Sequence, residues 1–339
     1  MKFITYAEID ELLKRHKNKR VAIVSHVNPD GDGLSAAIAL YFCLEKIYHA
    51  VPFIIMDSEF PTFLDFLPYK QCNIMSYDCY RANNKENFDL LVVLDCHEDT
   101  RVDTNIEIFD VSENILIIDH HVKKSQLLSA EYKHQNLYSH IDSDAVSTGV
   151  IINRFLYKHV KEINDSWKED YAILIYTTIL NDTDNFVNSN VDQETFLVVS
   201  DLIELGLKPH VVTNKFLFRS SIYYYKFIGE VLSTIEVRNN IAVFYATLEM
   251  LKRNHQTLDS FAKMMRWTKG SYDVELQVLF QQYEDNLFRV SMRSEVHDVA
   301  KIAQHFDGGG HQRAAGFQIK GELSESVNTV LSYIEGVIS

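Results

Sequence analysis

The chain of 339 residues contains no run of about 18 apolar residues, the length that a membrane-spanning helix needs. Its first segment, MKFITYAEIDELLKRHKNKR, has the pattern of a polar amphipathic helix and lacks the apolar centre of a signal peptide. The four cysteines show no CxxC spacing, which favours a reducing compartment. No internal repeat or low-complexity tract is present. These absences predict a cytoplasmic protein that does not associate with membranes.

Positive charge is scarce as well, and it is unevenly distributed. The net charge is −14. Residues 1–200 contain 18 Lys and Arg against 31 Asp and Glu, a balance of −13, whereas residues 201–339 contain 15 against 16, a balance of −1. Such an acidic chain is poorly suited to hold long duplex nucleic acid by its phosphates. A short phosphorylated ligand is compatible with it if the first half carries metal ions and the second half supplies cationic contacts.

The residues that are present suit a soluble globular protein, with 46% hydrophobic and 24% charged residues and enough length for two domains. The stretch Val21–Leu40, VAIVSHVNPDGDGLSAAIAL, predicts a buried strand, a turn and a helix beginning near Ser35. His26, Asp30 and Asp32 lie in the turn, at the strand end where open α/β sheets bind ligands. A cation among them would relieve their repulsion. An ordinary turn rich in Asp and Gly is the alternative.

Two more apolar runs end on residues of the same kind. Residues 88–95, FDLLVVLD, end at Asp95, and residues 114–121, NILIIDHH, end at His120 and His121. Buried strands with helical segments between them predict a parallel sheet, in which the three strand ends converge on one edge. Taken singly, Asp95 has the alternative of a helix cap, and His120 that of an ordinary core or surface histidine, which is the commoner role of a single His. The three ends together indicate a metal site.

Residues 139–152, SHIDSDAVSTGVII, read as a polar loop that runs into a helix. There Ser147, Thr148 and Gly149 have two interpretations. They offer hydroxyl and N–H groups to a substrate phosphate at the helix N-terminus, or they simply cap the helix.

A long apolar helix is predicted from residue 167 to residue 180, and the segment NDTDNF follows it directly. This segment carries Asp182 and Asp184, of which at most one needs to be a metal ligand. The aromatic and aliphatic residues of segments 192–205 and 209–232 predict helices whose apolar residues form core packing, and we interpret them as a connector.

The C-terminal part has a different pattern. Strands alternate about an Asn-Asn pair at residues 239–240, which predicts a hairpin, and two further strands are predicted at 274–280 and 287–293. Three consecutive glycines at 308–310 cost backbone entropy, so they indicate close approach of the main chain to a ligand or N–H groups offered to an anion. A flexible loop is the alternative. His311 and Arg313 follow the glycines directly.

These patterns predict an α/β protein whose N-terminal domain has a parallel sheet flanked by helices. A helical linker and a smaller C-terminal α/β domain follow it. The predicted boundaries are 1–190 for the metal-binding catalytic domain, 191–230 for the linker and 231–339 for the substrate-binding domain.

Four motifs occur in order along nearly the whole chain: HVNPDGDG, the strand ending at Asp95, IDHH at 118–121, and GGGHQRAAG near the C-terminus. In these motifs the chain resembles the DHH/DHHA1 phosphoesterase superfamily, and in size it is similar to the stand-alone nanoRNase type. The resemblance implies hydrolysis of very short RNA and of the 3′-phosphate of phosphoadenosine phosphate (pAp). It also implies a DHH domain with two Mn²⁺ ions, for which Mg²⁺ would substitute, and a DHHA1 domain that binds substrate.

The resemblance also implies roles for individual residues. The implied metal ligands are His26, Asp30, Asp32, Asp95, His120 and Asp182. Within this set Asp95 would bridge the two ions. Asp184 stands where the family has glycine, so either Asp182 or Asp184 serves as the fourth acid, and we choose Asp182. The implied catalytic and substrate-binding residues are His121, Arg293, Gly309, Gly310 and His311.

The chemistry of these residues agrees with the resemblance. Oxygen and imidazole ligands without thiolate favour Mn²⁺ or Mg²⁺, and two such ions activate water for attack on phosphorus. A protonated His121 would assist the leaving group, and Arg293 suits phosphate recognition. The alternative functions are hydrolysis of cyclic di-AMP or linear pApA, a RecJ-like exonuclease, and a nucleotide-binding regulator without catalysis. The sequence is compatible with a monomer and with a homodimer.

Overall fold

The computed structural model describes residues 2–83, 86–98, 101–104, 106–121, 136–261, 264–268 and 271–338. The chain divides into two units, the first ending at Arg219 and the second beginning at Ser220. Each unit has its own sheet, with seven strands in the first and six in the second. Among the described helices, none combines the length and the apolar character that crossing a bilayer requires.

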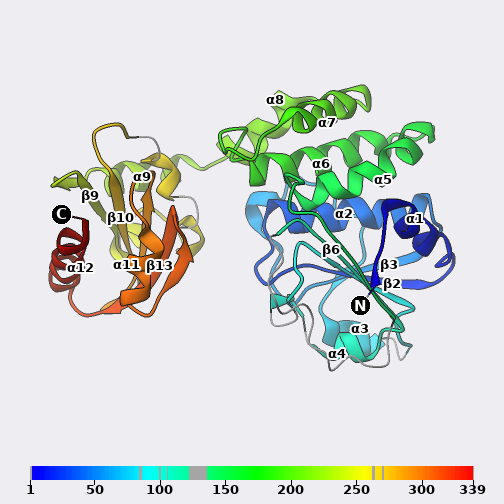
Figure 1. The fold of residues 1–339 in the computed structure, drawn as a ribbon, viewed down its shortest axis with the longest axis horizontal. Coiled ribbons are helices and arrows are strands. Elements are labelled where there is room, and N and C mark those ends of the chain that lie inside the picture. Colours follow the sequence, from blue (N-terminus) through cyan, green and yellow to red (C-terminus); the bar gives the residue numbers. More distant parts are fainter. Residues whose placement is uncertain are drawn as a thin grey trace. The chain divides into compact units, whose positions relative to one another are not determined.

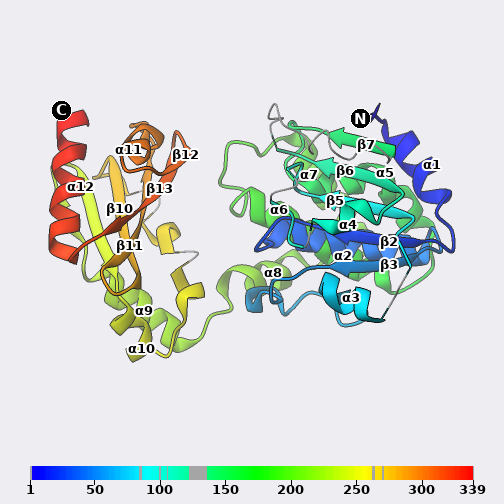
Figure 2. The same cartoon turned by 90° about the horizontal axis from the view of Figure 1, so that it is seen from below.

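The sheet of the first unit has the order β1-β7-β6-β5-β2-β3-β4, and its neighbouring strands are parallel. Figure 2 shows β7, β6, β5, β2 and β3 side by side. The strands are β1 (Lys2–Phe3), β2 (Arg20–Val24), β3 (Val51–Ile55), β4 (Ile74–Met75), β5 (Leu90–Leu94), β6 (Asn114–Asp119) and β7 (Asn136–Ile141). The central strands β2, β5 and β6 are almost wholly buried, as their continuous apolar runs predict.

Helices cover both faces of this sheet (Figure 1). One face, which includes Ile23 and Val92, packs on α1, α2, α5 and α6, and the other face, which includes Val24 and Val93, packs on α3 and α4. The helices are α1 (Tyr6–Lys14), α2 (Gly31–Lys46), α3 (Tyr77–Asn83), α4 (Glu107–Asp110), α5 (Thr148–Glu162), α6 (Trp167–Asp182), α7 (Gln193–Glu204) and α8 (Pro209–Thr213). A 3₁₀ turn spans Thr62–Leu64 and a π-helical turn spans Asn214–Phe218. Because successive side chains of a strand point to opposite faces, each continuous apolar run contributes to the cores on both faces of the sheet.

Helices α7 and α8 form a further layer on α6 (Figure 1). Their apolar residues Val198, Leu202 and Val212 join the core of the first unit. The division between the two units therefore lies inside the segment 191–230 that we predicted as a linker, after the helices that pack on α6.

The second unit is built on a mixed sheet of order β12-β13-β11-β10-β9-β8, in which β9 and β10 are parallel and the other pairs antiparallel. Its strands are β8 (Glu236–Arg238), β9 (Ile241–Ala246), β10 (Leu276–Glu284), β11 (Leu287–Ser294), β12 (Gly309–His311) and β13 (Ala314–Lys320). Its helices are α9 (Ile222–Leu232), α10 (Leu248–Arg253), α11 (Val299–His305) and α12 (Leu323–Ile338), with 3₁₀ turns at Leu258–Phe261 and Met264–Trp267. Helices α11 and α12 cover one face of the sheet, and α9, α10 and the first 3₁₀ turn cover part of the other.

The predicted α/β class with two sheet-containing domains is confirmed. The predicted hairpin is present as β8 and β9, and Asn239 and Asn240 both have positive φ (48° and 62°), as a tight hairpin turn requires. One expectation was wrong: residues 139–141 belong to strand β7 and not to a loop. The described residues between β3 and β5 include β4 and α3, and Tyr77 and Tyr80 of α3 are buried against the sheet.

Candidate metal centre

Helix α2 begins at Gly31, four residues earlier than the sequence predicted, so the acidic segment forms the start of the helix. Asp30 caps it, because its Oδ1 accepts hydrogen bonds from the N–H groups of Asp32 and Gly33 at 2.9 and 3.2 Å. Asn181 on α6 donates to Oδ2 of Asp30 at 3.0 Å and accepts from the N–H of Gly31 at 3.1 Å. These four bonds fix the loop between β2 and α2 against α6.

Gly33 allows the first turn of α2 to approach the end of the sheet. A Cβ atom at this position would lie 2.2 Å from Ser25 Oγ, 3.2 Å from Asp95 Oδ2 and 3.4 Å from His26 Nε2. Contacts this short force the backbone or its neighbours to move, so a side chain at Gly33 would disturb the cluster. The positive end of the α2 dipole consequently lies beside the acids of the site.

Asp32 is fully buried and receives two hydrogen bonds from the start of α5. The N–H groups of Thr148 and Gly149 donate to its two oxygens at 2.7 and 3.1 Å. The hydroxyl of Thr148 also donates to Oδ1 of Asp95 at 3.2 Å. The N-terminus of α5 therefore orients two carboxylates that the sequence predicts as metal ligands.

Ser147 is the N-cap of α5, and its Oγ accepts from the N–H of Val150 at 3.2 Å. Ser147 and Thr148 are both fully buried. Since Asp32 occupies the N–H groups of Thr148 and Gly149, the first turn has its donors satisfied from within the protein. This geometry favours the capping interpretation over the predicted contact with a substrate phosphate.

The ends of β2, β5 and β6 bring His26, Asp95 and His120 together, as the parallel sheet predicts. Each carboxylate oxygen of Asp95 faces one histidine: Oδ2 lies 3.4 Å from His26 Nε2, and Oδ1 lies 3.4 Å from His120 Nε2. Asp95 adopts a left-handed backbone conformation (φ 58°), which turns the chain sharply after β5. One carboxylate thus lies between two imidazoles.

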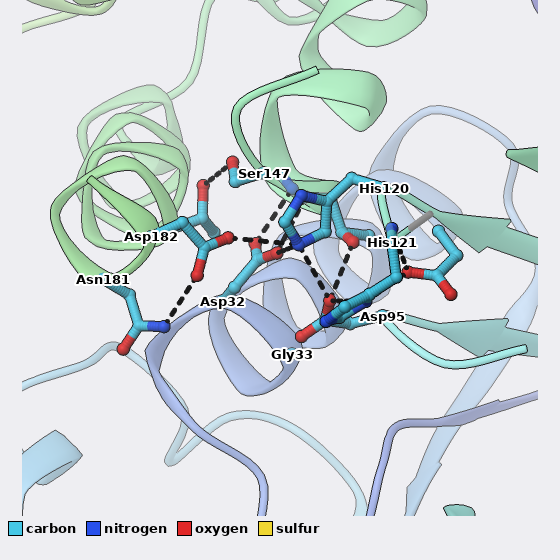
Figure 3. Close-up of polar contacts among 12 residues, drawn as sticks. Asp32, Gly33, Asp95, His120, His121, Ser147, Asn181 and Asp182 are labelled. Carbon is cyan, nitrogen blue, oxygen red and sulfur yellow. Dashed lines mark hydrogen bonds and ion pairs between the residues drawn. The ribbon is translucent and has the colours of Figure 1, made fainter. Parts of the chain in front are cut away.

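His120 faces two further acids (Figure 3). Its Nε2 lies 3.4 Å from Asp182 Oδ2 and 3.7 Å from Asp32 Oδ2. On the other side of Asp95, His26 Nε2 lies 3.7 Å from Asp30 Oδ1. The ligand atoms of His26, Asp30 and Asp95 lie within 4.8 Å of one another, and so do those of Asp32, His120 and Asp182.

The acids of this cluster have the properties of cation ligands. Oδ2 of Asp182 is buried and has no hydrogen-bond partner within the described residues. Burial, with the charges of Asp32 and Asp95, raises the pKa of Asp182 well above its usual range. Burial and the charge of Asp95 likewise raise the pKa of Asp32 to about 7. A divalent cation would give the buried oxygen a partner and stabilise both carboxylates in their ionised form.

The pKa values of the histidines reflect the excess of negative charge around them. Burial alone would lower the pKa of His26, but hydrogen bonding to Asp30 and Asp95 outweighs burial and raises the pKa to about 10. For His120, burial is outweighed by Asp95 and Asp32, and the pKa rises to about 9. Imidazole binds a metal in its neutral form, so a metal ion would replace these protons.

Asp182 and Asp184 differ in their surroundings. Asp182 is the last residue of α6 and belongs to the cluster with Asp32 and His120. Asp184 begins a run of three residues with positive φ (47°, 60° and 64°), which turns the chain away from the helix axis. Among the described residues, Asp184 belongs to neither of the two groups described above, nor to a third group of Asp95, His120 and His121. Asp182 is therefore the better candidate for the fourth acid.

Two residues of the site were missed from the sequence. Oδ1 of Asp119, the last residue of β6, accepts from the N–H of His121 at 3.1 Å and pairs with its Nδ1 at 2.8 Å. Its Oδ2 contacts Nδ1 of His97, which is buried. Burial opposes ionisation of Asp119, but hydrogen bonding and the charge of His121 outweigh it and hold the pKa well below its usual range. Nδ1 of His121 also lies 3.5 Å from Asp95 Oδ1, so this chain of contacts fixes the imidazole beside the cluster.

In the second unit, the three glycines are present for different reasons. A Cβ at Gly308 would lie 2.4 Å from the carbonyl oxygen of Gly316, and Gly310 has φ 143°, a conformation that favours glycine. A Cβ at Gly309 would meet nothing within 4 Å. The fold therefore requires glycine at 308 and 310 but leaves open space at 309, on the exposed strand β12.

The remaining predicted substrate residues share one row of this sheet. Ala314 of β13 lies opposite Arg293 of β11 on one side and His311 of β12 on the other. The guanidinium of Arg293 donates to the carbonyl oxygen of Met292 at 2.8 Å, and His311 is exposed. The sheet register thus brings together two residues that are 18 positions apart in the sequence.

Comparisons with known proteins agree with this arrangement. Residues 20–179 match the DHH family, N-terminal domain, and residues 240–339 match the DHHA1 domain. The chain belongs to the DHH/DHHA1 family. Both domains occur in the order that the motifs predict, and together they include nearly every residue discussed above.

Two relatives named as NrnA match this chain over most of their length. The bifunctional oligoribonuclease and PAP phosphatase NrnA of Thermus thermophilus is 27% identical over 93% of this chain and 89% of the relative. The protein of the same name from Bacillus subtilis is 24% identical over 87% of each chain. An exopolyphosphatase-related protein from Bacteroides fragilis has the same fold, with a TM-score of 0.82 and 22% identity over 97% of this chain and 94% of that one. This DHH/DHHA1 chain is a hydrolase.

Replacing Asp95 with asparagine tests the central position of this carboxylate. Asparagine tolerates the left-handed backbone of Asp95, so the fold should persist while one negative charge is lost. We expect Mn²⁺ to raise the melting temperature of the wild type and to leave that of Asp95→Asn unchanged. Asp184→Asn is a matched control, because Asp184 has the same backbone conformation (φ 47°) outside the cluster. Metal analysis that finds equal Mn²⁺ in Asp95→Asn and the wild type would contradict the assignment.

His97 offers a test of how His121 is oriented. Removing the imidazole in His97→Ala frees one oxygen of Asp119, so the pair with His121 should loosen. We expect kcat for a chromogenic phosphodiester to fall by about 10- to 100-fold with metal content and KM unchanged. His97→Asn retains a side-chain N–H donor and should recover part of the loss. Equal kcat in wild type and His97→Ala would show that this contact is dispensable.

Proposed function

We propose that the chain is a cytoplasmic Mn²⁺-dependent phosphoesterase that hydrolyses short oligoribonucleotides and removes the 3′-phosphate of pAp. The observation that carries this proposal is the position of Asp95, which directs one oxygen toward His26 and the other toward His120. A carboxylate placed in this way can bridge two metal ions. The ligands of the two ions would be His26, Asp30, Asp32, Asp95, His120 and Asp182.

The ligand set supports Mn²⁺, with Mg²⁺ as a substitute. It consists of four carboxylates and two imidazoles and contains no thiolate. Oxygen-rich sites of this kind favour Mg²⁺ and Mn²⁺ over a structural zinc ion. Two divalent cations bound there would supply Lewis acidity toward the phosphoryl oxygens and lower the pKa of a water molecule between them.

The protein holds its own acids in position before substrate arrives. Two backbone N–H groups of α5 bind Asp32, and the hydroxyl of Thr148 binds Asp95. Both acids are almost completely buried, so their side chains have little freedom to rotate. Preorganisation of this kind avoids the reorganisation cost that flexible ligands would add during the reaction.

His121 is suited to donate a proton. Its hydrogen bond with Asp119 outweighs the effect of burial and raises the pKa of the imidazole above its ordinary value. The ring is partly exposed, unlike the buried acids beside it, so substrate can reach it. We assign it the role of general acid, which protonates the oxygen that leaves phosphorus.

In the second unit, Arg293, Gly309, Gly310 and His311 would bind the phosphate and base of the substrate. Arginine binds phosphate through two parallel N–H donors. The open space at Gly309 allows a ligand to approach the backbone without meeting a side chain. This group of contacts is compact, which supports a substrate of a few nucleotides.

The relatives support the same substrates, since the T. thermophilus and B. subtilis proteins are named as bifunctional oligoribonucleases and PAP phosphatases. All four cysteines are free, in agreement with a reducing cytoplasm. The alternatives are hydrolysis of linear pApA or cyclic di-AMP, and processive degradation of long single strands.

A turnover panel with Mn²⁺ separates these functions. The substrates are pAp, RNA of 2 to 24 nucleotides, linear pApA and cyclic di-AMP. We expect pAp and RNA of up to about five nucleotides to react fastest, and binding not to tighten with length, because the acidic first half repels a long polyanion. EDTA should abolish activity. Cleavage of 24-mers as fast as dimers, or turnover of cyclic di-AMP alone, would refute the proposal.

Neighbouring histidines should behave differently when they are replaced. His120→Ala removes a proposed ligand and should reduce the amount of bound Mn²⁺. His121→Ala should retain both ions and lose kcat by roughly 10²- to 10⁴-fold, because it removes the proposed general acid. Metal analysis by mass spectrometry, paired with kinetics on pAp, distinguishes the two effects. The reverse pattern would show that the two roles are exchanged.

A further inference from the structure

Strand β11 carries two arginines, and one of them, Arg289, has no role in the function proposed above. Arg289 lies four residues before Arg293 on the same strand, so both side chains point to the same face of the sheet. The residues between them alternate: Val290 and Met292 are buried in the core, whereas Ser291 faces the same side as the arginines. Four residues of extended strand place the two Cα atoms about 13 Å apart.

The row between the two arginines consists of small residues. Ser291 of β11 lies opposite Gly316 of β13, and Gly316 lies opposite Gly309 of β12. Gly316 admits no side chain, because a Cβ would lie 2.7 Å from the carbonyl oxygen of Val290. The strands therefore form a trough. Its floor consists of backbone and one hydroxyl group, and Arg289 and Arg293 lie on its two sides.

A hollow of about 550 Å³ opens at the Arg289 side of this trough. Its lining combines a cation, an amide, an acid, two phenylalanines and the two glycines of the floor. These residues are Arg289, Phe306, Asp307, Gly309, Gly316, Phe317 and Gln318. A hollow of this size accommodates a nucleoside, and Asp307 offers acceptors to its hydroxyl or amino groups.

Neither Arg289 nor Arg293 forms an ion pair with a described residue. The guanidinium of Arg293 has its hydrogen bond to the carbonyl of Met292, and that of Arg289 extends from an exposed position on β11. The two guanidinium groups on this face repel each other, and each retains N–H donors for a ligand.

We propose that Arg289 binds a second phosphate, so that the trough holds one nucleotide with a phosphate at each arginine. The nucleoside lies over Ser291, Gly316 and Gly309, where side chains are absent or small. The inference rests on the proposed function for the chemical class of the ligand. It deepens that function, because it makes the phosphate that does not react a determinant of specificity.

This arrangement predicts which nucleotides bind. A nucleoside 3′,5′-bisphosphate engages both arginines, and a nucleoside monophosphate engages one. A 5′-phosphorylated dinucleotide also carries two phosphates flanking a ribose, so it should bind better than the same dinucleotide without its terminal phosphate. The number of phosphates flanking one ribose thus determines affinity, and chain length beyond two nucleotides adds little.

Binding of pAp, 5′-AMP and 3′-AMP to the full-length protein in EDTA tests the proposal without any contribution from catalysis. The variants are Arg289→Ala and Arg293→Ala. Lys301→Ala is the matched control, because Lys301 is an exposed cation of the same unit on α11. Calorimetry at fixed salt measures the affinities. Thermal unfolding verifies that each variant is folded.

We expect the wild type and Lys301→Ala to bind pAp about 10- to 100-fold more tightly than either monophosphate. Arg289→Ala should weaken the binding of pAp by this factor. It should also weaken the binding of one of the two monophosphates and leave that of the other unchanged. Arg293→Ala should show the complementary pattern. These patterns assign each arginine to the 5′- or the 3′-phosphate, whichever way round the nucleotide lies in the trough.

Three results would overturn the proposal. They are failure of the wild type to bind pAp, unchanged pAp affinity in Arg289→Ala, and equal weakening of all three ligands in a folded Arg289→Ala protein. Turnover with Mn²⁺ distinguishes this inference from the proposed function. Complementary binding patterns without hydrolysis of pAp would refute the function and leave the phosphate site standing, and hydrolysis that is insensitive to Arg289→Ala would do the opposite.

Discussion

The first unit depends on one electrostatic constraint, the crowding of carboxylates into a largely buried site. Asp32 and Asp95 are almost inaccessible to solvent, and Asp182 has a buried oxygen without a hydrogen-bond partner among the described residues. Burying an uncompensated charge costs on the order of several kcal/mol, so positive charge must balance these acids. The raised pKa values of His26 and His120 show the strength of this demand. Protons or metal ions can satisfy it.

Backbone groups orient the acids more than other side chains do. The start of α2 donates N–H groups to Asp30, and the start of α5 donates to both oxygens of Asp32. Each helix N-terminus carries roughly half a positive charge, which partly offsets the carboxylates. The close approach of α5 to α6 requires glycine at position 149, since a Cβ there would lie 2.2 Å from the hydroxyl of Thr178. The positions of the acids therefore follow from helices that the sheet and the core fix in place.

The sequence predicts the parts of the site that follow continuous apolar runs. Asp95 and His120 come directly after buried strands, so their convergence follows from the parallel sheet alone. His97 and Asp119 were missed because their contact depends on how the ends of β5 and β6 turn, which no local pattern reports. Strand β7 (136–141) escaped notice because it is only partly buried and has few apolar residues. The position of Arg289 next to the row of Ser291, Gly316 and Gly309 depends on strand register, which also lies beyond local patterns.

Glycine illustrates why a residue type has to be interpreted through its surroundings. At Gly33 a side chain would collide with Ser25, and at Gly308 it would collide with β13, so the protein itself explains these two glycines. At Gly309 a side chain would meet only open space, and the backbone there does not require glycine. Because glycine raises the entropic cost of folding, its presence at 309 needs a reason outside the fold. The ligand that we propose on the floor of the trough would supply that reason, and the arginines on either side would bind its phosphates.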